Sequence, residues 1–520
     1  MILLVHPPVS KPCEPPPGIA RLAGALRERN IPHLLLDANR EGLQHLLERT
    51  IQGDSVDTWT RRARSGLKKN LRLLTTTGGY ENPDRYRRAV SDVNRALGRS
   101  RPDLRPRVTL ANYEDPALSP LRSGDLLAAA ERPDENPFFP WFRDRLSALL
   151  DKPGFTHVGF SLNYLSQALC TFAMIGHLRR LKPDLCILLG GGLATSWARL
   201  PGFARPFRGL VDEVIDGPGE ARLLPLLGES PGLFPPRPDY RSLLGPEGSS
   251  ADLSYLSPGP ILPYSASSGC YYGKCAFCPE RAEGSPYSPI PPKRAAEEIR
   301  CLAAEFRPTL IHLLDNAVSP AHLSALIQDP PGPPWYGFVR VSAQLADPDF
   351  CAALKRSGCV MLQIGIESGS QEILDSLDKG IRLETASKAL QCLRTAGIAS
   401  YVYLLFGTPG EAEPEARETL DFTVRHSESI GFLNLSVFNL PVRSTGMQDL
   451  DDRPFYDGDL SLYHGFRHPR GWDRPQVRRF LQSEFRRHPA IAPILRRDPP
   501  LFTSNHAPFF TGEFLTRIRH

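Results

Sequence analysis

The chain has 520 residues, of which 41% are hydrophobic and 23% are charged, and these ordinary values exclude a largely disordered chain. Its length predicts two to four domains. The formal net charge of +5 is small, and no stretch reaches the roughly 18–20 apolar residues that a bilayer span requires. We therefore predict a globular protein without a membrane span.

The first residues, MILLVHPP, lack the basic region and the long apolar segment of a secretory signal. We therefore predict a cytoplasmic protein, in which thiols stay reduced. In such a compartment, the ten cysteines are more typical of metal ligands or catalytic groups than of a disulfide framework.

The N-terminal residues alternate between apolar runs and helical patterns. An apolar run at 2–5 is followed by a helical pattern over 19–28 and a second apolar run at 33–36, which is the pattern of a βαβ unit. The alternation resumes with a strand at 156–161, a helix at 165–181 and a strand at 185–189. We therefore predict that residues 1–230 form a Rossmann-like, doubly wound α/β domain.

A polar, Arg-rich insertion of mostly helical character interrupts this domain at about residues 50–150. Residues 61–107 carry 14 Lys and Arg against 4 Asp and Glu, a local excess of +10. Such a stretch can bind an anionic partner, including RNA. It shows no interleaved aromatic residues that would stack on bases, so we interpret it as a solvated helical insertion and predict no nucleic-acid partner.

Residues 231–259 are rich in Pro, Gly and Ser and are predicted to be a linker. A second βα series occupies 260–445, with six predicted strands at 261–265, 310–314, 336–342, 360–366, 400–406 and 432–438. Six such units predict an open, partial (β/α)6 barrel with its functional groups at the C-terminal ends of the strands. The alternation stops there, and we predict a C-terminal extension over 446–520.

Three cysteines, Cys270, Cys275 and Cys278, follow the first predicted barrel strand within nine residues. Thiolates are the ligands of iron–sulfur clusters, and three protein ligands would leave one iron of a [4Fe–4S] cluster open to a small molecule. Structural zinc is an alternative that needs a fourth ligand. A [2Fe–2S] centre is another, because plant-type ferredoxins share the C-x4-C-x2-C spacing. The next cysteine, Cys301, lies on a predicted amphipathic helix and is interpreted as a core residue.

This loop, in its βα context, resembles the cluster-binding loop of the radical S-adenosylmethionine (SAM) superfamily. The resemblance implies that Cys270, Cys275 and Cys278 hold a [4Fe–4S] cluster whose open iron binds SAM. Reductive cleavage of SAM would then yield methionine and a 5′-deoxyadenosyl radical. Phe277 matches the aromatic residue that usually precedes the last cysteine of the family. One departure is the first gap, which has four residues where the family usually has three.

The resemblance covers roughly 260–445 and includes successive strand ends. Asp315 and Asn316 stand where the family contacts the amino group of SAM, and Arg340 resembles its contact to the SAM carboxylate. Glu367 resembles the ribose-binding carboxylate, which accepts hydroxyl hydrogen bonds, although a lone Glu at a strand end is more often a helix cap or a surface group. The implied SAM-binding set is Phe277, Asp315, Asn316, Arg340, Glu367, Ser368 and Gly407.

The N-terminal domain resembles the cobalamin (B12)-binding domain that is often fused to radical SAM barrels. The matching features are the segments 16–23, 159–161, 190–192 and 217–220. The implied cobalamin contacts are Ser161, Leu162, Gly190, Gly191, Gly192, Gly217, Gly219 and Glu220. The sequence contains no Asp-x-His-x-x-Gly, the motif that supplies a histidine to cobalt. Cobalamin would therefore bind without a protein histidine, or the domain keeps the fold without the cofactor.

The two resemblances together imply cobalamin-dependent methyl transfer to an unactivated carbon of a small-molecule or peptide substrate, with a reductant such as flavodoxin or ferredoxin. Cyclisation or rearrangement, a zinc-binding module and a non-catalytic scaffold are the alternatives. A methylthiotransferase would need a second set of cluster cysteines, which Cys13, Cys170 and Cys186 do not form.

Overall fold

The computed structural model describes residues 1–51, 57–98, 106–244, 254–444, 450–499 and 506–511. Its described residues form two compact units, one of residues 1–261 with 457–461 and one of residues 262–456 with 462–499 and 506–511. Parts of the predicted insertion (52–56 and 99–105), linker (245–253) and C-terminal extension (446–449, 500–505 and 512–520) lie outside the described residues. Within those ranges, no helix is both long and apolar enough to cross a bilayer.

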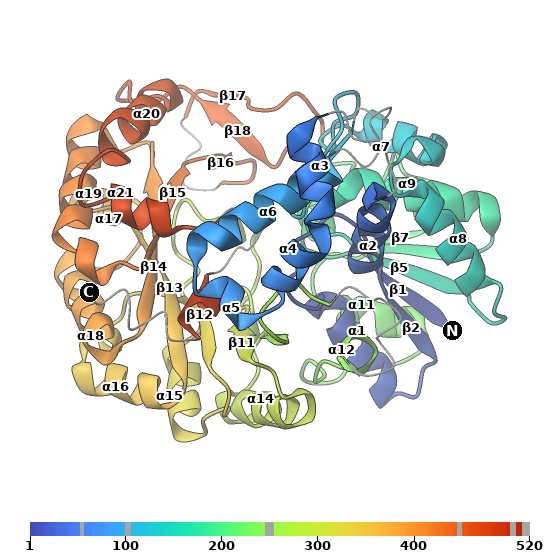
Figure 1. Cartoon of the computed structure of the whole chain (residues 1–520), viewed down its shortest axis with the longest axis horizontal. Coiled ribbons are helices and arrows are strands. Elements are labelled where there is room, and N and C mark those ends of the chain that lie inside the picture. Colours follow the sequence, from blue (N-terminus) through green and yellow to red (C-terminus); the bar gives the residue numbers. More distant parts are fainter. Residues whose placement is uncertain (52–56, 99–105, 245–253, 445–449, 500–505, 512–520) are drawn as a thin grey trace. The chain divides into compact units, whose positions relative to one another are not determined.

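The first unit is built on a five-stranded parallel sheet in the order β2-β1-β5-β6-β7 (Figure 1). Its order reverses between β1 and β5, and sheets of this type bind ligands outside the carboxyl ends of the strands at such a point. The predicted Rossmann-like fold is confirmed. The strands are β1 (Ile2–His6), β2 (His33–Asp37), β5 (His157–Ser161), β6 (Cys186–Gly190) and β7 (Glu213–Val214).

The connecting helices and the insertion complete this unit. Capping side chains fix the start of insertion helices: the Asp57 side chain accepts a hydrogen bond from Thr60 N, and the Asn82 side chain accepts one from Arg85 N. The connecting helices are α1 (Pro17–Glu28), α2 (Ala38–Ile51), α9 (Leu165–Leu181), α10 (Gly192–Ala198), α11 (Gly219–Leu226) and α12 (Arg241–Leu244). The insertion contains α3 (Thr58–Ser65), α4 (Leu67–Leu74), α5 (Thr77–Tyr80), α6 (Pro83–Leu97), β3 (Arg107–Val108), β4 (Tyr113–Glu114), α7 (Ser123–Glu131), η1 (Pro133–Glu135) and α8 (Phe139–Leu150).

Helices α7 and α9 approach each other closely at Gly176. A Cβ atom at this position would lie 1.9 Å from the carbonyl oxygen of Ala130, which is backbone and cannot rotate away. The contact therefore depends on glycine.

We expect Gly176→Ala to destabilise the first unit, because the added methyl group must force the two helices apart. Overpacking of this kind costs about 1–3 kcal/mol, or roughly 2–10 °C in the Tm of a unit of this size. Gly124→Ala in α7 is the matched control, since its Cβ meets nothing within 4 Å. Calorimetry that gives both variants the same Tm would contradict this packing.

The second unit is built on a six-stranded sheet in the order β15-β14-β13-β12-β11-β8. Neighbouring strands from β11 to β15 are parallel. The sheet is open at its edge strands, β8 and β15, so the predicted partial barrel is confirmed. The strands are β8 (Ile261–Tyr264), β11 (Leu310–Leu313), β12 (Trp335–Val339), β13 (Cys359–Glu367), β14 (Ala399–Phe406) and β15 (Phe432–Val437).

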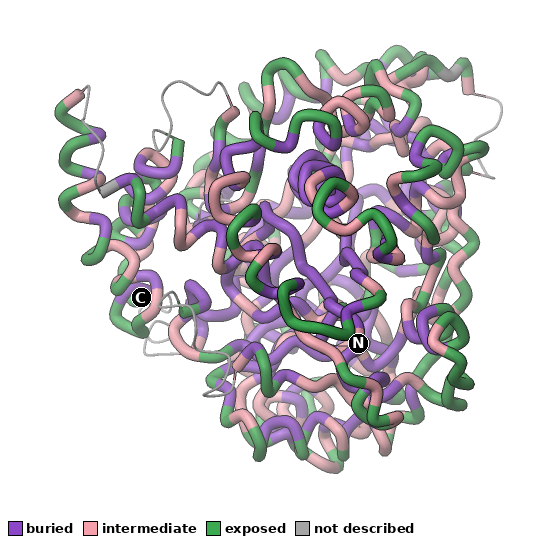
Figure 2. Tube along the Cα trace, turned by 90° about the vertical axis from the view of Figure 1, so that its right-hand side faces the viewer, coloured by how far each residue is buried: buried purple, intermediate pink, exposed green. Residues whose placement is uncertain are grey.

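The core of this unit lies where the strands meet their helices. Every residue of β13 is buried, as expected for a strand covered on both faces. In the view of the chain in Figure 2, buried segments likewise lie mostly inside and exposed segments mostly outside. The helices beside the strands are α14 (Pro292–Phe306), α15 (Pro320–Gln328), η3 (Gln344–Ala346), α16 (Pro348–Arg356), α17 (Gln371–Ser376), α18 (Leu383–Ala396), α19 (Glu413–Arg425) and η4 (Ser427–Ser429).

The described part of the C-terminal segment forms a small antiparallel sheet followed by short helices. The sheet has the order β16-β18-β17. The last helical turn of the segment packs against the barrel edge, since the Phe510 ring lies 5.2 Å from the Phe432 ring of β15. The elements are β16 (Leu440–Pro441), β17 (Asp452–Pro454), β18 (Tyr463–Phe466), α20 (Arg474–Phe480), the π-helix η5 (Leu481–Phe485), α21 (Ala492–Arg497) and η6 (Ala507–Phe510).

Candidate active site

The three clustered cysteines lie on the loop that connects β8 to α13 (Pro279–Glu283). A short ladder between β9 (Ser267–Ser268) and β10 (Ser288–Pro289) closes the base of this loop. Cys270, Cys275 and Cys278 are free thiols, and each is half-buried. The loop therefore presents three sulfur ligands at the carboxyl end of the first barrel strand.

Burial and neighbouring charges both act on the thiols of the loop. Burial raises the pKa of Cys275 and of Cys278, and the charge of Cys270 raises both further. Lys379 and Arg340 act in the opposite direction on Cys275, because a nearby positive charge favours the thiolate. Since the thiolate is the metal-binding form, these cations favour ligation.

The donor set fits an iron–sulfur cluster. Each cysteine of a [4Fe–4S] site binds a different iron, so the three sulfurs need not converge on one point. Within the described ranges, no group of three or more His, Cys, Asp or Glu side chains is arranged so that it could hold a single metal ion.

The predicted residues after β11 contact the segment that leads into the cysteine loop. Asp315 is buried, and its carboxylate accepts hydrogen bonds from Ser267 Oγ at 2.5 Å and from Ala266 N at 3.1 Å. Burial raises the pKa of Asp315, and these two hydrogen bonds oppose that rise. Asn316 is exposed and donates from Nδ2 to the carbonyl of Gly269 at 3.4 Å. Both side chains therefore adjoin the loop, where a bound cofactor would meet them.

Arg340 follows β12 directly and turns toward the cysteine loop. The sequence predicted a strand over 336–342, but β12 ends at Val339, and Arg340 is already outside the sheet. Its Nη1 lies 3.7 Å from Cys275 Sγ, and its guanidinium stacks on the Tyr272 ring at 3.5 Å. Arg340 therefore contacts the cysteine loop from just beyond the end of the strand.

Glu367 ends β13 in a left-handed conformation (φ +70°), which is uncommon for a residue with a side chain and is often found at functional sites. Its carboxylate is buried and accepts a hydrogen bond from Lys379 Nζ at 2.8 Å. Lys379 in turn lies 5.5 Å from the Phe277 ring. Glu367 and Phe277 therefore both lie close to the ammonium group of Lys379, a residue that the sequence analysis did not identify.

Ser368 and Gly407 differ in their surroundings. The Ser368 hydroxyl is buried against α19 and lies 3.1 Å from Thr419 Oγ1, so its hydrogen bond serves the packing of that helix. Gly407 has φ +76° and donates its N–H to the carboxylate of Glu411. That carboxylate also accepts a hydrogen bond from Trp472 Nε1 at 3.1 Å, so a C-terminal side chain supports the loop after β14.

We expect Glu411 to make the second unit less stable as the pH rises through about 7. The side chain is fully buried, and burial raises its pKa from 4.5 to about 7. The folded protein then binds a proton that the unfolded chain releases, so this stabilisation is complete below about pH 4.5 and is lost above about pH 7. The difference corresponds to on the order of 3 kcal/mol.

The measurement is the Tm at pH 5.5 and pH 8 in wild type and Glu411→Gln. The amide has the neutral charge of the protonated acid, so the variant should show a smaller fall in Tm between the two pH values. An equal fall in both proteins would contradict the raised pKa. Glu413→Gln, on the exposed start of α19, is the control.

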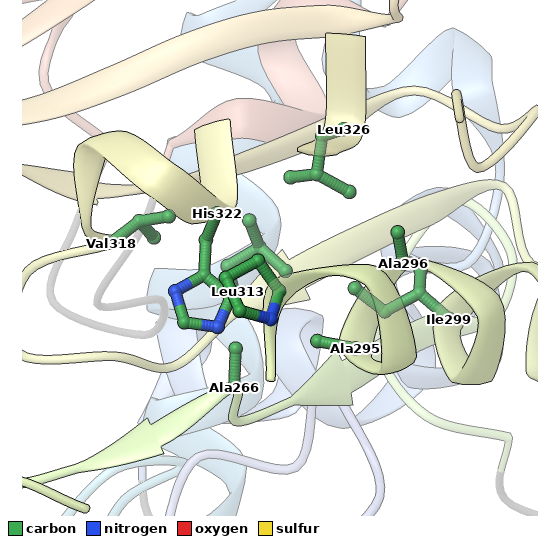
Figure 3. A pocket seen from close by; sticks show the side chains of 9 residues that line it. Ala266, Ala295, Ala296, Ile299, Leu313, Val318, His322 and Leu326 are labelled. Atoms are coloured by element: carbon green, nitrogen blue, oxygen red, sulfur yellow. The ribbon is translucent and has the colours of Figure 1, made fainter. Parts of the chain in front are cut away.

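A small pocket between β11, α14 and α15 has an apolar lining and belongs to the core (Figure 3). Its one polar side chain, His322, is engaged on both ring nitrogens. Nε2 donates to the carbonyl of Ile290 at 2.9 Å, and Nδ1 lies 2.7 Å from Ser319 Oγ. The pocket therefore offers no polar group to a cofactor.

In the first unit, the structure brings together the predicted residues at the ends of β5 and β6. Leu162 N donates to the carbonyl of Gly190 at 2.7 Å. Gly191 has φ +103°, and a Cβ there would lie 2.5 Å from the Leu162 carbonyl oxygen. The Asn163 side chain joins Ser161 to Gly192, with its Oδ1 3.0 Å from Gly192 N. Because glycine has no side chain, Gly191 allows these two loops to approach each other closely.

The remaining predicted residues of the first unit lie at the start of α11. Gly217 N donates to Thr195 Oγ1 at 3.1 Å, which links this turn to α10. A Cβ at Gly219 would lie 3.1 Å from Leu22 of α1, and Glu220 forms an ion pair with Arg21. Gly219 and Glu220 therefore hold α11 against α1, whereas a Cβ at Gly217 would meet nothing within 4 Å.

Comparison with known proteins places the barrel in a family. Residues 264–423 match the family model of the Radical SAM superfamily. This span begins at the end of β8 and contains the cysteine loop and every predicted SAM-binding residue. No curated protein sequence matches the chain.

Two solved structures resemble the chain as a whole. The radical S-adenosylmethionine methyltransferase TsrM from Kitasatospora setae, with tryptophan substrate and a SAM analogue bound, is 17% identical, with a TM-score of 0.52 over 86% of this chain and 75% of that chain. The same enzyme with cobalamin and a [4Fe–4S] cluster bound is also 17% identical, with a TM-score of 0.52 over 88% of this chain and 77% of that chain. At this identity the likeness establishes a shared fold.

The fold and the family match identify the second unit as a radical SAM domain. The chain is therefore an enzyme that combines this domain with a Rossmann-like unit, as the sequence predicted.

Proposed function

We propose that the protein binds a [4Fe–4S] cluster on Cys270, Cys275 and Cys278, cleaves SAM reductively, and uses cobalamin to transfer a methyl group to an unactivated carbon. The observation that carries this proposal is the cysteine loop with Arg340 3.7 Å from Cys275, at the strand ends of a radical SAM domain. Once reduced, a cluster of this kind supplies the electron that cleaves SAM into methionine and a 5′-deoxyadenosyl radical.

The residues of the chain would bind and orient SAM. Glu367 offers a buried carboxylate to the ribose hydroxyls, and Asp315 offers one to the amino group. Arg340 presents a guanidinium beside Cys275, where the SAM carboxylate would find a fixed bidentate donor. The loop after β14, held by Glu411, would flank the adenine with backbone groups.

Cobalamin is proposed for the first unit on narrower grounds. Sheets of this order bind ligands at the carboxyl ends of the strands beside the point where the order reverses, here between β1 and β5, and Ser161 and Leu162 stand at the end of β5. TsrM, which has the same fold, binds cobalamin. Neither His6, which lies 2.8 Å from Ser10 Oγ, nor His177, which packs on Phe139, has the motif context of a cobalt ligand. The substrate would be a small molecule or a peptide, and a flavodoxin or ferredoxin would supply electrons.

The test uses protein purified and reconstituted without oxygen, with dithionite and SAM, in the presence and absence of cobalamin. We expect 5′-deoxyadenosine and S-adenosylhomocysteine, both dependent on cobalamin. Deoxyadenosine alone would favour cyclisation or rearrangement over methyl transfer. Neither product from iron-loaded protein would contradict the proposal and favour a non-catalytic scaffold.

A further inference from the structure

The turn at Leu377–Gly380, between α17 and α18, forms one wall of the cysteine loop. Ala276 N donates to the carbonyl of Leu377 at 2.9 Å, and the Tyr272 hydroxyl donates to the carbonyl of Asp378 at 2.8 Å. Gly380 has φ +63°, and a Cβ there would lie 2.1 Å from the Tyr272 hydroxyl oxygen. The turn therefore fits the loop so closely that Gly380 admits no side chain.

This turn carries Lys379 to the interior. Lys379 is only 4% exposed, and its ammonium group forms its ion pair with Glu367. The Lys379 carbonyl accepts a hydrogen bond from Arg340 Nη2 at 2.6 Å. Because Arg340 also contacts Cys275, and the Lys379 ammonium lies 5.5 Å from the Phe277 ring, the turn and Arg340 bring two buried cations to the cysteine loop.

The charges beside Cys275 do not cancel. Lys379 is paired with the carboxylate of Glu367 at 2.8 Å, and the guanidinium of Arg340 lies 3.7 Å from Cys275 Sγ. These three side chains are two cations and one anion, so together they place a positive charge beside the cysteine loop. For a given cluster type, net charge and hydrogen bonds to the sulfurs are among the determinants of the reduction potential.

We propose that Lys379 and Arg340 are positioning residues that raise the reduction potential of a cluster bound on the cysteine loop. Reduction adds one electron, taken from an external donor that is thereby oxidised, and makes the site one charge more negative. A neighbouring positive charge stabilises that state more than the oxidised one. This inference rests on the proposed function, because it requires the cluster.

The test is a potentiometric titration monitored by electron paramagnetic resonance (EPR), on reconstituted protein without SAM. Lys379→Met and Arg340→Gln should each lower the equilibrium constant for reduction at least tenfold, which is about 59 mV for one electron. Glu367→Gln should shift the potential in the opposite direction, since it removes the opposing negative charge. Lys388→Met on the exposed face of α18 removes the same charge elsewhere and should leave the potential unchanged.

The charge-conserving Lys379→Arg separates charge from packing, and its potential should stay closer to wild type than that of Lys379→Met. Equal potentials in wild type, Lys379→Met and Arg340→Gln, all with full iron content, would overturn the inference and leave the proposed function intact. A wild-type protein that takes up no cluster would contradict the proposed function itself. If a charge-removing variant loses iron, the Glu367→Gln variant decides the question. A reduction potential above that of wild type supports the inference, and an equal or lower potential overturns it.

Discussion

Replacing Cys275 with alanine is expected to abolish both the cluster and SAM cleavage. Three protein ligands hold the proposed cluster, and Cys275 is the one that Arg340 contacts. Its removal takes away a ligand and leaves that cation without the thiolate that it favours. Iron content and the absorbance near 400 nm should fall to background, and 5′-deoxyadenosine should fall to the level of a protein-free control.

The matched control is Cys301→Ala. Cys301 is a free, exposed cysteine on α14, so its interpretation as a core residue was wrong, and its thiol makes no contribution to the proposed site. We expect this variant to keep the iron content and the cleavage activity of wild type. Full iron and undiminished cleavage in Cys275→Ala would remove that residue from the ligand set.

Replacing Glu367 with alanine is expected to weaken SAM binding while sparing the cluster. The carboxylate ends β13 beside Lys379 and would accept two hydroxyl hydrogen bonds from the ribose. Hydrogen bonds to a charged group are worth about 1.5–3 kcal/mol, so we expect the Kd for SAM to rise on the order of 10- to 100-fold. Anaerobic equilibrium dialysis with the oxidised protein measures this directly.

Glu384→Ala provides the comparison for Glu367→Ala, because Glu384 is an exposed acid in the first turn of α18. Its affinity for SAM should equal that of wild type. If Glu367→Ala also binds SAM with wild-type affinity, Glu367 has no contact with the ribose. Lower iron content in Glu367→Ala would instead assign Glu367 a structural role at the loop.

The sequence predicts the fold and the cysteine loop well because both depend on local patterns. Alternating apolar runs and helical faces indicate two parallel sheets, and three cysteines within nine residues are a local signal. Strand ends are less accurate, as Arg340 shows: a hydrophobic pattern cannot reveal that its side chain leaves the sheet for Cys275. Ser368 likewise lies at a strand end, but its hydroxyl bonds to Thr419.

The sequence analysis did not identify Lys379 or Trp472, because each acts on residues distant in the chain. Lys379 lies about a hundred residues from Cys275, and lysine is rarely buried, so its sequence context suggests a solvated turn. Trp472 supports Glu411 from the C-terminal segment, where no motif was recognised. Both depend on tertiary contacts, and only the Gly380 that follows Lys379 gives a local sign of a tight turn.

The most direct test of the central claim is EPR spectroscopy of the anaerobically reconstituted, dithionite-reduced protein, before and after addition of SAM, with iron and sulfide measured on the same sample. A [4Fe–4S] cluster on three cysteines predicts about four iron and four sulfide per chain, and a spectrum that changes when SAM binds the open iron. Zinc in place of iron, a two-iron content, or a four-iron spectrum that SAM leaves unaltered would contradict the account.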